Sequence, residues 1–203
     1  MELSNNTPQL ILASASPRRR ELLQQAGVTF TVVSSNTPEI IQAGETAEGY
    51  AQRVASEKAV DVARRHPGAW VLGADTIVAI EGEILGKPQD EAEGRRMLRL
   101  LSSRTHRVMT AFTLVGGEGQ VCASQVITSQ VTFKPLSDTQ IDEYLATGEP
   151  FDKAGAYAVQ GLGAALVERV EGSYANVVGL PVDEVLAALR AVGLLHRKDA
   201  QPV

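Results

Sequence analysis

The sequence predicts a mixed α/β fold, and three observations support that prediction. Apolar runs of strand length alternate along the chain with segments of helical period. Helices separate some of these strands, whereas short glycine turns join others directly as hairpins. The chain has 203 residues, 44% of them hydrophobic, which is enough to bury one sizeable core or to form two lobes that share a sheet. We expect a single domain.

The first strand and helix are predicted from L-I-L-A-S-A-S-P-R-R-R-E-L-L at residues 10–23. The apolar start favours a buried strand, and Pro17 suits the first turn of a helix over residues 17–26 with Ser16 as its N-cap. Three arginines at 18–20 fill that first turn, where the helix dipole disfavours cations. They either pair with surface acids or bind an anion. The cluster favours a phosphate chain, because backbone N–H groups, serine hydroxyls and guanidinium groups all bind phosphate.

A second strand is expected at residues 28–33, followed by a loop over 34–44 in which Glu39 is the one acid. Residues 47–65 have a helical period, and Lys58 lies in the middle of their apolar stripe. Such a lysine either extends its ammonium group to water or points into a cleft. Glu39 is correspondingly either a solvated loop carboxylate or a second member of that cleft.

The most apolar strand, V-L-G-A-D-T-I-V-A-I at residues 71–80, contains one acid, Asp75. A buried, unpaired carboxylate costs several kcal/mol, so Asp75 must meet a cation or lie where the strand enters a cleft. The cation is either a metal ion held for catalysis or the partner in a structural salt bridge. A turn at Gly82 sends residues 84–88 back antiparallel, which brings Lys87 towards Asp75.

The remaining elements follow from caps, glycine turns and hydrophobic periods: a helix over 90–101, a hairpin of strands 106–115 and 121–133, a helix over 137–146, a strand over 164–170 and a helix over 181–191. Between them, residues 151–163 read F-D-K-A-G-A-Y-A-V-Q-G-L-G. This loop contains Lys153 and Gln160, and its three glycines allow the backbone to approach a ligand closely.

Composition excludes several function classes. The net charge of -5 and the pI of about 5.3 argue against general attraction to nucleic acids or membranes. Cys122 is the only cysteine, so neither an internal disulfide nor a four-cysteine zinc site is possible. No histidine is placed to form a nucleophilic dyad with it. Residues 1–9 contain no targeting signal, and no apolar run approaches a membrane span, so we expect a soluble, cytoplasmic protein.

The unusual charged residues come from otherwise apolar elements. They are four cations and two carboxylates: Arg18, Arg19, Lys58 and Lys87 against Glu39 and Asp75. These are the parts needed for metal-assisted phosphoryl chemistry, in which carboxylates hold a divalent cation and the attacking water and cations neutralise phosphate charge.

Six spaced motifs resemble the Maf family of nucleoside triphosphate pyrophosphatases. They are S-A-S-P-R-R-R-E-L-L at Ser14, S-E-K-A at Ser56, L-G-A-D-T at Leu72, G-E-I-L-G-K-P at Gly82, D-K-A-G-A-Y at Asp152 and G-S-Y-A-N-V-V-G-L-P at Gly172. The resemblance extends from about residue 10 to 189. It implies a single Maf-like domain over 1–203 with flexible ends at 1–9 and 194–203. The implied fold is an elongated mixed sheet flanked by helices, similar to inosine triphosphate pyrophosphatase, with a central cleft between two lobes.

The resemblance also implies residue roles, a cofactor and an assembly. Asp75 would be the catalytic carboxylate, joined in the catalytic set by Glu39 and Lys87, with Glu39 and Asp75 holding Mg²⁺ or Mn²⁺. The implied phosphate contacts are Ser14, Arg18, Arg19, Lys58 and Lys87. The family further implies a nucleoside triphosphate as substrate and a homodimer.

Within the family, the branch that cleaves dTTP and UTP is similar to this chain at A-D-T and at A-Y-x-x-Q-G. Arg18, Thr76 and Gln160 are then the specificity positions, and Lys153, beside Gln160 in the glycine-rich loop, is a further substrate-binding residue. An amide offers both a donor and an acceptor to a pyrimidine edge, whereas a carboxylate only accepts. Two alternatives stay open: a 7-methyl-GTP pyrophosphatase, and a nucleotide-binding regulator of septum formation and cell division with little turnover.

Overall fold

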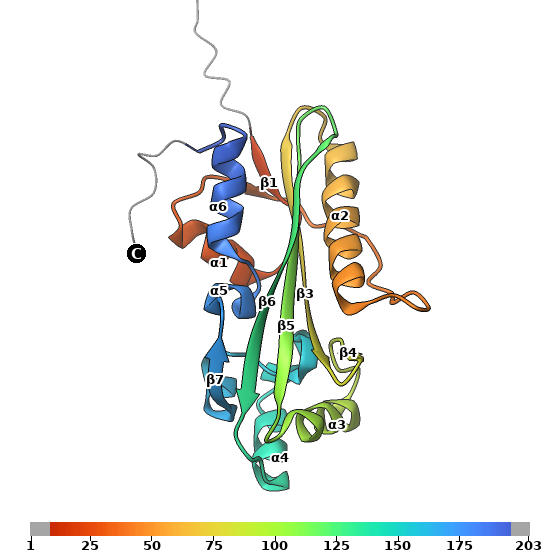
Figure 1. Ribbon diagram of the computed structural model, residues 1–203, viewed down its shortest axis with the longest axis vertical. Helices are drawn as coiled ribbons and strands as arrows, with labels where there is room; N and C mark the ends of the chain where they lie inside the picture. Colours follow the sequence, from red (N-terminus) through yellow and green to blue (C-terminus); the bar gives the residue numbers. More distant parts are fainter. Residues whose placement is uncertain (1–8, 196–203) are drawn as a thin grey trace, which may run out of the picture.

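The computed structural model describes residues 9–195, which form an elongated α/β molecule built on one seven-stranded mixed sheet (Figure 1). The strand order is β2-β1-β3-β5-β6-β7, with β4 paired to β3. Only the pairs of β1 with β2 and with β3 are parallel. The strands are β1 Leu10–Leu12, β2 Thr31–Val32, β3 Trp70–Ile80, β4 Glu83–Leu85, β5 Thr105–Val115, β6 Val121–Phe133 and β7 Val167–Glu171. The predicted mixed α/β fold class is thus confirmed.

Helices cover both faces of the sheet. In Figure 1, α2 lies on one side of the long strands, α1 and α6 lie on the other, and α3 and α4 gather at the opposite end of the molecule. The α-helices are α1 Pro17–Gln25, α2 Ala47–Arg65, α3 Glu91–Leu101, α4 Asp138–Ala146, α5 Tyr174–Val178 and α6 Val182–Ala191. Three short 3₁₀ helices follow α4: η1 Glu149–Asp152, η2 Ala154–Ala156 and η3 Gly161–Leu166.

The described residues form four hydrophobic clusters, of which two pack beneath α2 and the other two lie at opposite ends of the sheet. One cluster joins α1, β1 and α6 through Leu12, Leu23 and Leu189. Another joins α3 and α4 to the far ends of the long strands through Leu98 and Phe133. The long strands β5 and β6 connect the two clusters, which is the arrangement of two lobes sharing one sheet.

Three predicted boundaries differ from the structure. The second strand is limited to Thr31–Val32, and the last begins at Val167 because a 3₁₀ helix occupies the residues before it. The predicted turn over 171–176 instead contains the start of α5, a helix of five residues that is too short to show a hydrophobic period. Ser173 caps this helix by accepting a hydrogen bond from the Asn176 N–H at 3.2 Å.

The described residues at the two ends of the chain, 9 and 194–195, include backbone hydrogen bonds to the folded elements. The carbonyl of Gln9 accepts a hydrogen bond from the Trp70 N–H at 2.9 Å, and the Leu194 N–H donates to Leu189 at 2.9 Å. Residues 1–8 and 196–203 lie outside the described residues. None of the helices within residues 9–195 combines the length and hydrophobicity needed to span a bilayer.

The middle of β3 has one unpaired edge. β5 pairs along the other edge, whereas β1 pairs with residues 70–72 and β4 with residues 78–80. Among the strands that the structure describes, none pairs with residues 73–77 on this edge, and Asp75 and Thr76 lie inside that gap. Neighbouring strand residues point to opposite faces, so an open edge is what allows both side chains to reach one cleft.

The buried side chain of His106 should make the folded protein less stable in acid. Its Nε2 lies 2.7 Å from the Tyr157 hydroxyl, its Nδ1 has no partner among the described residues, and burial lowers its pKa to about 4. Below about pH 6.5 the histidine is therefore protonated in the unfolded chain but stays neutral in the folded chain. The free energy of unfolding consequently falls as the pH drops from 6.5 to 4, by roughly 3 kcal/mol in total.

Urea unfolding across that pH range measures the effect. His106→Gln should flatten the slope, since glutamine keeps hydrogen-bonding capacity but does not titrate. His66→Gln, at the C-cap of α2, is the matched control. Equal slopes in wild type and His106→Gln would contradict the assignment.

Candidate active site

A cleft of about 480 Å³ opens beside the unpaired edge of β3. Its walls come from α1, α2, β3, the segment after β4 and the loop that contains η1 and η2. All ten side chains predicted from the sequence line it: Ser14, Arg18, Arg19, Glu39, Lys58, Asp75, Thr76, Lys87, Lys153 and Gln160. Elements separated by more than a hundred residues thus meet at a single concave surface.

Helix α2 approaches β3 very closely at Gly73. A Cβ atom at Gly73 would lie 2.3 Å from the Ala55 carbonyl oxygen and 2.7 Å from the Ala59 nitrogen, so only glycine fits there. This contact brings Lys58 over Asp75, with Lys58 Nζ 2.7 Å from Asp75 Oδ1. Lys58 therefore points into the cleft, and Asp75 does form the salt bridge that was one of the two alternatives for it.

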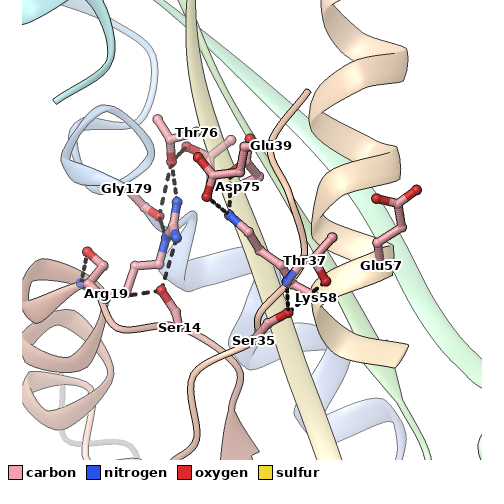
Figure 2. A network of polar contacts seen from close by, with 12 residues as sticks. Ser14, Arg19, Ser35, Thr37, Glu39, Glu57, Lys58, Asp75, Thr76 and Gly179 are labelled. Atoms are coloured by element: carbon pink, nitrogen blue, oxygen red, sulfur yellow. Dashed lines mark hydrogen bonds and ion pairs between the residues drawn. The ribbon is translucent and has the colours of Figure 1, made fainter. Parts of the chain in front are cut away.

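The Lys58 ammonium group also binds the loop carboxylate. Its Nζ lies 2.6 Å from Glu39 Oε1, so two carboxylates converge on one nitrogen (Figure 2). Glu57, the preceding residue on α2, points away from this group in the same view. Lys87, which is exposed, lies 3.6 Å from the other Glu39 oxygen and not beside Asp75. The turn between β3 and β4 thus brings Lys87 to the cleft as predicted, but beside Glu39 and not beside Asp75.

The environments of the two carboxylates shift their pKa values in opposite directions. Burial raises the pKa of Asp75, which is 5% exposed, against the opposing charges of Lys58 and Arg19. Burial opposes ionisation of Glu39 as well, but the hydrogen bond and charge of Lys58 lower its pKa. A pair of acids separated in this way is typical of sites where one carboxylate accepts a proton and the other stays ionised.

The arginines at the start of α1 have different surroundings. Ser16 caps the helix and Pro17 follows it, as predicted. Arg19 is buried and donates to Ser14 Oγ at 3.0 Å, Thr76 Oγ1 at 2.9 Å and the Gly179 carbonyl at 2.8 Å. Neutral acceptors leave its charge uncompensated at close range, which suits an anion in the cleft.

Arg18 lies at the mouth of the cleft, where its Nη1 is 3.4 Å from Asp152 Oδ2. Lys153 also forms an ion pair with Asp152 and donates to the Glu149 carbonyl at 2.7 Å. Gln160 is exposed on the cleft, and its side chain makes no hydrogen bond to any described residue. Its amide is therefore free to meet a ligand.

The cleft is cationic although the chain as a whole is acidic. Five cationic side chains line it against three carboxylates, which are Glu39, Asp75 and Asp152. The local excess of positive charge favours a small polyanion, whereas the net charge of -5 repels long ones.

The donor set also fits a divalent cation. Mg²⁺ is commonly bound by one or two carboxylates together with substrate phosphates and water. Glu39 and Asp75 present oxygens within 2.7 Å of a common point, now taken by the Lys58 ammonium group. Within residues 9–195 no group of three or more His, Cys, Asp or Glu side chains is arranged to hold a metal ion.

Three cleft residues were not singled out from the sequence. Tyr50 lines the cleft from α2, and burial, reinforced by the charges of Asp75 and Glu39, raises its pKa to about 12. Asp152 pairs with Arg18 at the rim. The Gly179 carbonyl accepts a hydrogen bond from Arg19 and so orients it. The only sequence signal for the positive φ of Gly179 is the glycine itself in the motif that begins at Gly172. Their roles depend on neighbours that are distant in the sequence.

A family model described as "Maf-like protein" matches residues 9–192. The chain belongs to the Maf family. Two of its relatives are called dTTP/UTP pyrophosphatase. That of Geobacter sulfurreducens is 51% identical over 92% of this chain and 98% of its own length. That of Myxococcus xanthus is 54% identical over 91% and 93%, respectively.

A solved structure of the nucleoside-triphosphatase, or dITP/XTP pyrophosphatase, of Mycobacterium abscessus is more distant. It is 16% identical to this Maf chain, covers 94% of this chain and 98% of its own, and has a TM-score of 0.44.

Proposed function

We propose that this Maf protein hydrolyses dTTP and UTP to the nucleoside monophosphate and pyrophosphate. The observation that carries the proposal is the ion-paired group at the open edge of β3, in which the buried Asp75 and Lys58 meet the exposed Glu39 inside a cationic cleft. The names of the relatives at 51% and 54% identity supply the nucleotides.

The chain's own residues divide the chemistry between the two ends of the cleft. Asp75, whose pKa is raised by burial, would accept the proton of the attacking water, and Lys87 and Arg18 would bind phosphate oxygens. Glu39 and Asp75 would hold Mg²⁺ or Mn²⁺, which when bound supplies positive charge to the phosphate chain. At the other end, Gln160 would meet the base.

A pyrophosphate-release assay tests the proposal. Purified protein is incubated with dTTP, UTP, CTP, GTP and 7-methyl-GTP, each with Mg²⁺ or Mn²⁺, and the products are separated to identify monophosphate. We expect release to be fastest with dTTP and UTP. No release above a no-enzyme control would overturn the enzyme assignment in favour of a nucleotide-binding regulator of division, and a preference for 7-methyl-GTP would assign the chain to that branch.

Gln160→Glu tests the reading of the base. Its side chain lies exposed on the cleft without a described hydrogen-bond partner, so a change there should leave the fold intact. A carboxylate cannot donate to a uracil oxygen, and the preference for UTP over the other nucleotides should fall about ten- to hundredfold in kcat/KM. An unchanged preference would remove Gln160 from base recognition.

A homodimer and a cytoplasmic location are further parts of the proposal. The dimer rests on the family resemblance alone, and the location rests on the sequence. The dimer predicts a mass of about twice 21.6 kDa by light scattering at micromolar concentration. A monomeric mass at that concentration would contradict it.

A further inference from the structure

Side chains outside the cleft hold the loop that carries Gln160: Tyr174 donates to the Val159 carbonyl at 3.3 Å, and Tyr144 and Glu149 bind the N–H groups on both sides. Tyr144 is buried on α4, at the end of the molecule drawn lowest in Figure 1, and Glu149 begins η1 just after it. The Tyr144 hydroxyl donates to Glu149 Oε1 at 2.9 Å. Neither residue belongs to the cleft lining, so neither is placed to touch a substrate.

This pair binds the loop on both sides of Gln160. On one side, the Ala158 N–H donates to the Tyr144 hydroxyl at 3.1 Å. On the other, the N–H groups of Leu162 and Gly163 donate to the Glu149 carboxylate at 3.1 and 2.9 Å. Two residues before Gln160 and two after it, the backbone is therefore tied to one hydrogen-bonded pair.

The glycines of the loop match this arrangement. Gly161 has a φ of +64°, and a Cβ there would lie 2.7 Å from Glu149 Oε2. A Cβ at Gly163 would lie 2.5 Å from the Tyr144 hydroxyl oxygen. The sequence predicted these glycines to allow close approach to a ligand, but the structure shows that they allow the backbone to reach Glu149 and Tyr144.

The carboxylate is suited to accept these bonds. Burial opposes its ionisation, but the N–H of Gly163, the Tyr144 hydroxyl and the N–H of Leu162 together lower the pKa of Glu149. An ionised acceptor makes stronger hydrogen bonds to N–H groups than a neutral one.

We propose that Tyr144 and Glu149 are positioning residues for base selection, which fix the backbone of Gln160 and thereby aim its amide at the base. This inference rests on the proposed dTTP and UTP pyrophosphatase activity. An amide reads a donor and acceptor pattern only when it is held in place, and an error of about 1 Å in such a contact costs up to a hundredfold in rate. The phosphate end of the cleft is built on α1, α2 and β3, whereas the side-chain hydrogen bonds of this pair join Tyr144 and Glu149 to each other and to the Gln160 loop.

A purely structural role would have a different signature. It would lower stability, or the rate with every nucleotide equally, because it would not distinguish one base from another. At ring positions 3 and 4, cytosine has an acceptor and a donor where uracil has a donor and an acceptor. The ratio of kcat/KM for UTP to kcat/KM for CTP therefore isolates the effect on recognition of the base.

The experiment is a double-mutant cycle on that ratio. It compares wild type, Glu149→Gln, Gln160→Ala and the double variant, with melting temperatures recorded for each. Glu149→Gln keeps the backbone carbonyl that accepts a hydrogen bond from Lys153, so this contact at the start of the loop is retained. Glu143→Gln is the matched control, since Glu143 is exposed on α4 and makes no hydrogen bond or ion pair within the described residues.

Glu149→Gln should lower the UTP to CTP ratio about tenfold, mainly through slower UTP turnover, and Glu143→Gln should not change it. In the Gln160→Ala background, Glu149→Gln should have no further effect on the ratio. An unchanged ratio, an equal loss for both nucleotides, or additive effects in the double variant would overturn the inference.

Tyr144→Phe replaces Glu149→Gln if the latter does not fold, because it removes only the hydroxyl that joins Ala158 to Glu149. The same changes in the UTP to CTP ratio then support or overturn the positioning role. Wild-type protein is assayed first: if it hydrolyses neither dTTP nor UTP, the proposed function fails and this inference fails with it. If wild type prefers UTP and the variants keep that preference, only the positioning role is refuted.

Discussion

Asp75→Asn should lower kcat by about two to four orders of magnitude with every nucleotide while nucleotide binding changes much less. The carboxylate is 5% exposed, its pKa is raised by burial, and it lies in the one stretch of β3 with an open edge. An amide has the same shape but cannot accept the proton of the attacking water. Steady-state kinetics, with titration of a non-hydrolysable UTP analogue for binding, separate the two effects.

Asp142→Asn is the matched control for that experiment. Asp142 also pairs with a cation, Arg95, but on the surface of α4 and away from the cleft. It should have nearly wild-type kcat. Near wild-type turnover in Asp75→Asn would refute the catalytic assignment, whereas loss of folding can be recognised from its melting temperature.

Lys58→Met should have the largest combined effect on activity and stability. Its ammonium group neutralises two carboxylates at 2.6 and 2.7 Å, and removal of one partner from a buried ion pair costs about 3 kcal/mol in unfolding free energy. Turnover should fall about a hundredfold, because a cation near the phosphates is lost and Asp75 is no longer compensated. Urea unfolding and steady-state kinetics measure the two losses.

Added Mn²⁺ provides a second measurement on the same variant. With the ammonium group absent, Glu39 and Asp75 are left with an uncompensated charge that a divalent cation would satisfy, so Mn²⁺ should raise the melting temperature of Lys58→Met more than that of wild type. Lys134→Met, which removes an exposed lysine far from the cleft, should behave as wild type does. Equal responses to Mn²⁺ in Lys58→Met and wild type would argue against a metal site at these carboxylates.

Much of the fold was determined by local sequence signals. Ser16 and Pro17 set the start of α1, and Ser137 with Gln140 forms the predicted capping box of α4. The apolar run around Asp75 forms β3 within one residue of its predicted start. The sequence also indicated which charged residues line the cleft, since a carboxylate or ammonium group inside an apolar element must meet an opposite charge or face a cleft.

Only the tertiary structure decided how those residues are arranged. That Asp75 lies at an open edge depends on where β1 ends and β4 begins, and the contact between Lys58 and Asp75 depends on how closely α2 approaches Gly73. The positions of Tyr144 and Glu149 behind the Gln160 loop likewise follow from packing between segments. Local propensity and periodicity describe a residue's own element, whereas these contacts join elements that are distant in the sequence, and their geometry is set by how side chains fill the space between those elements.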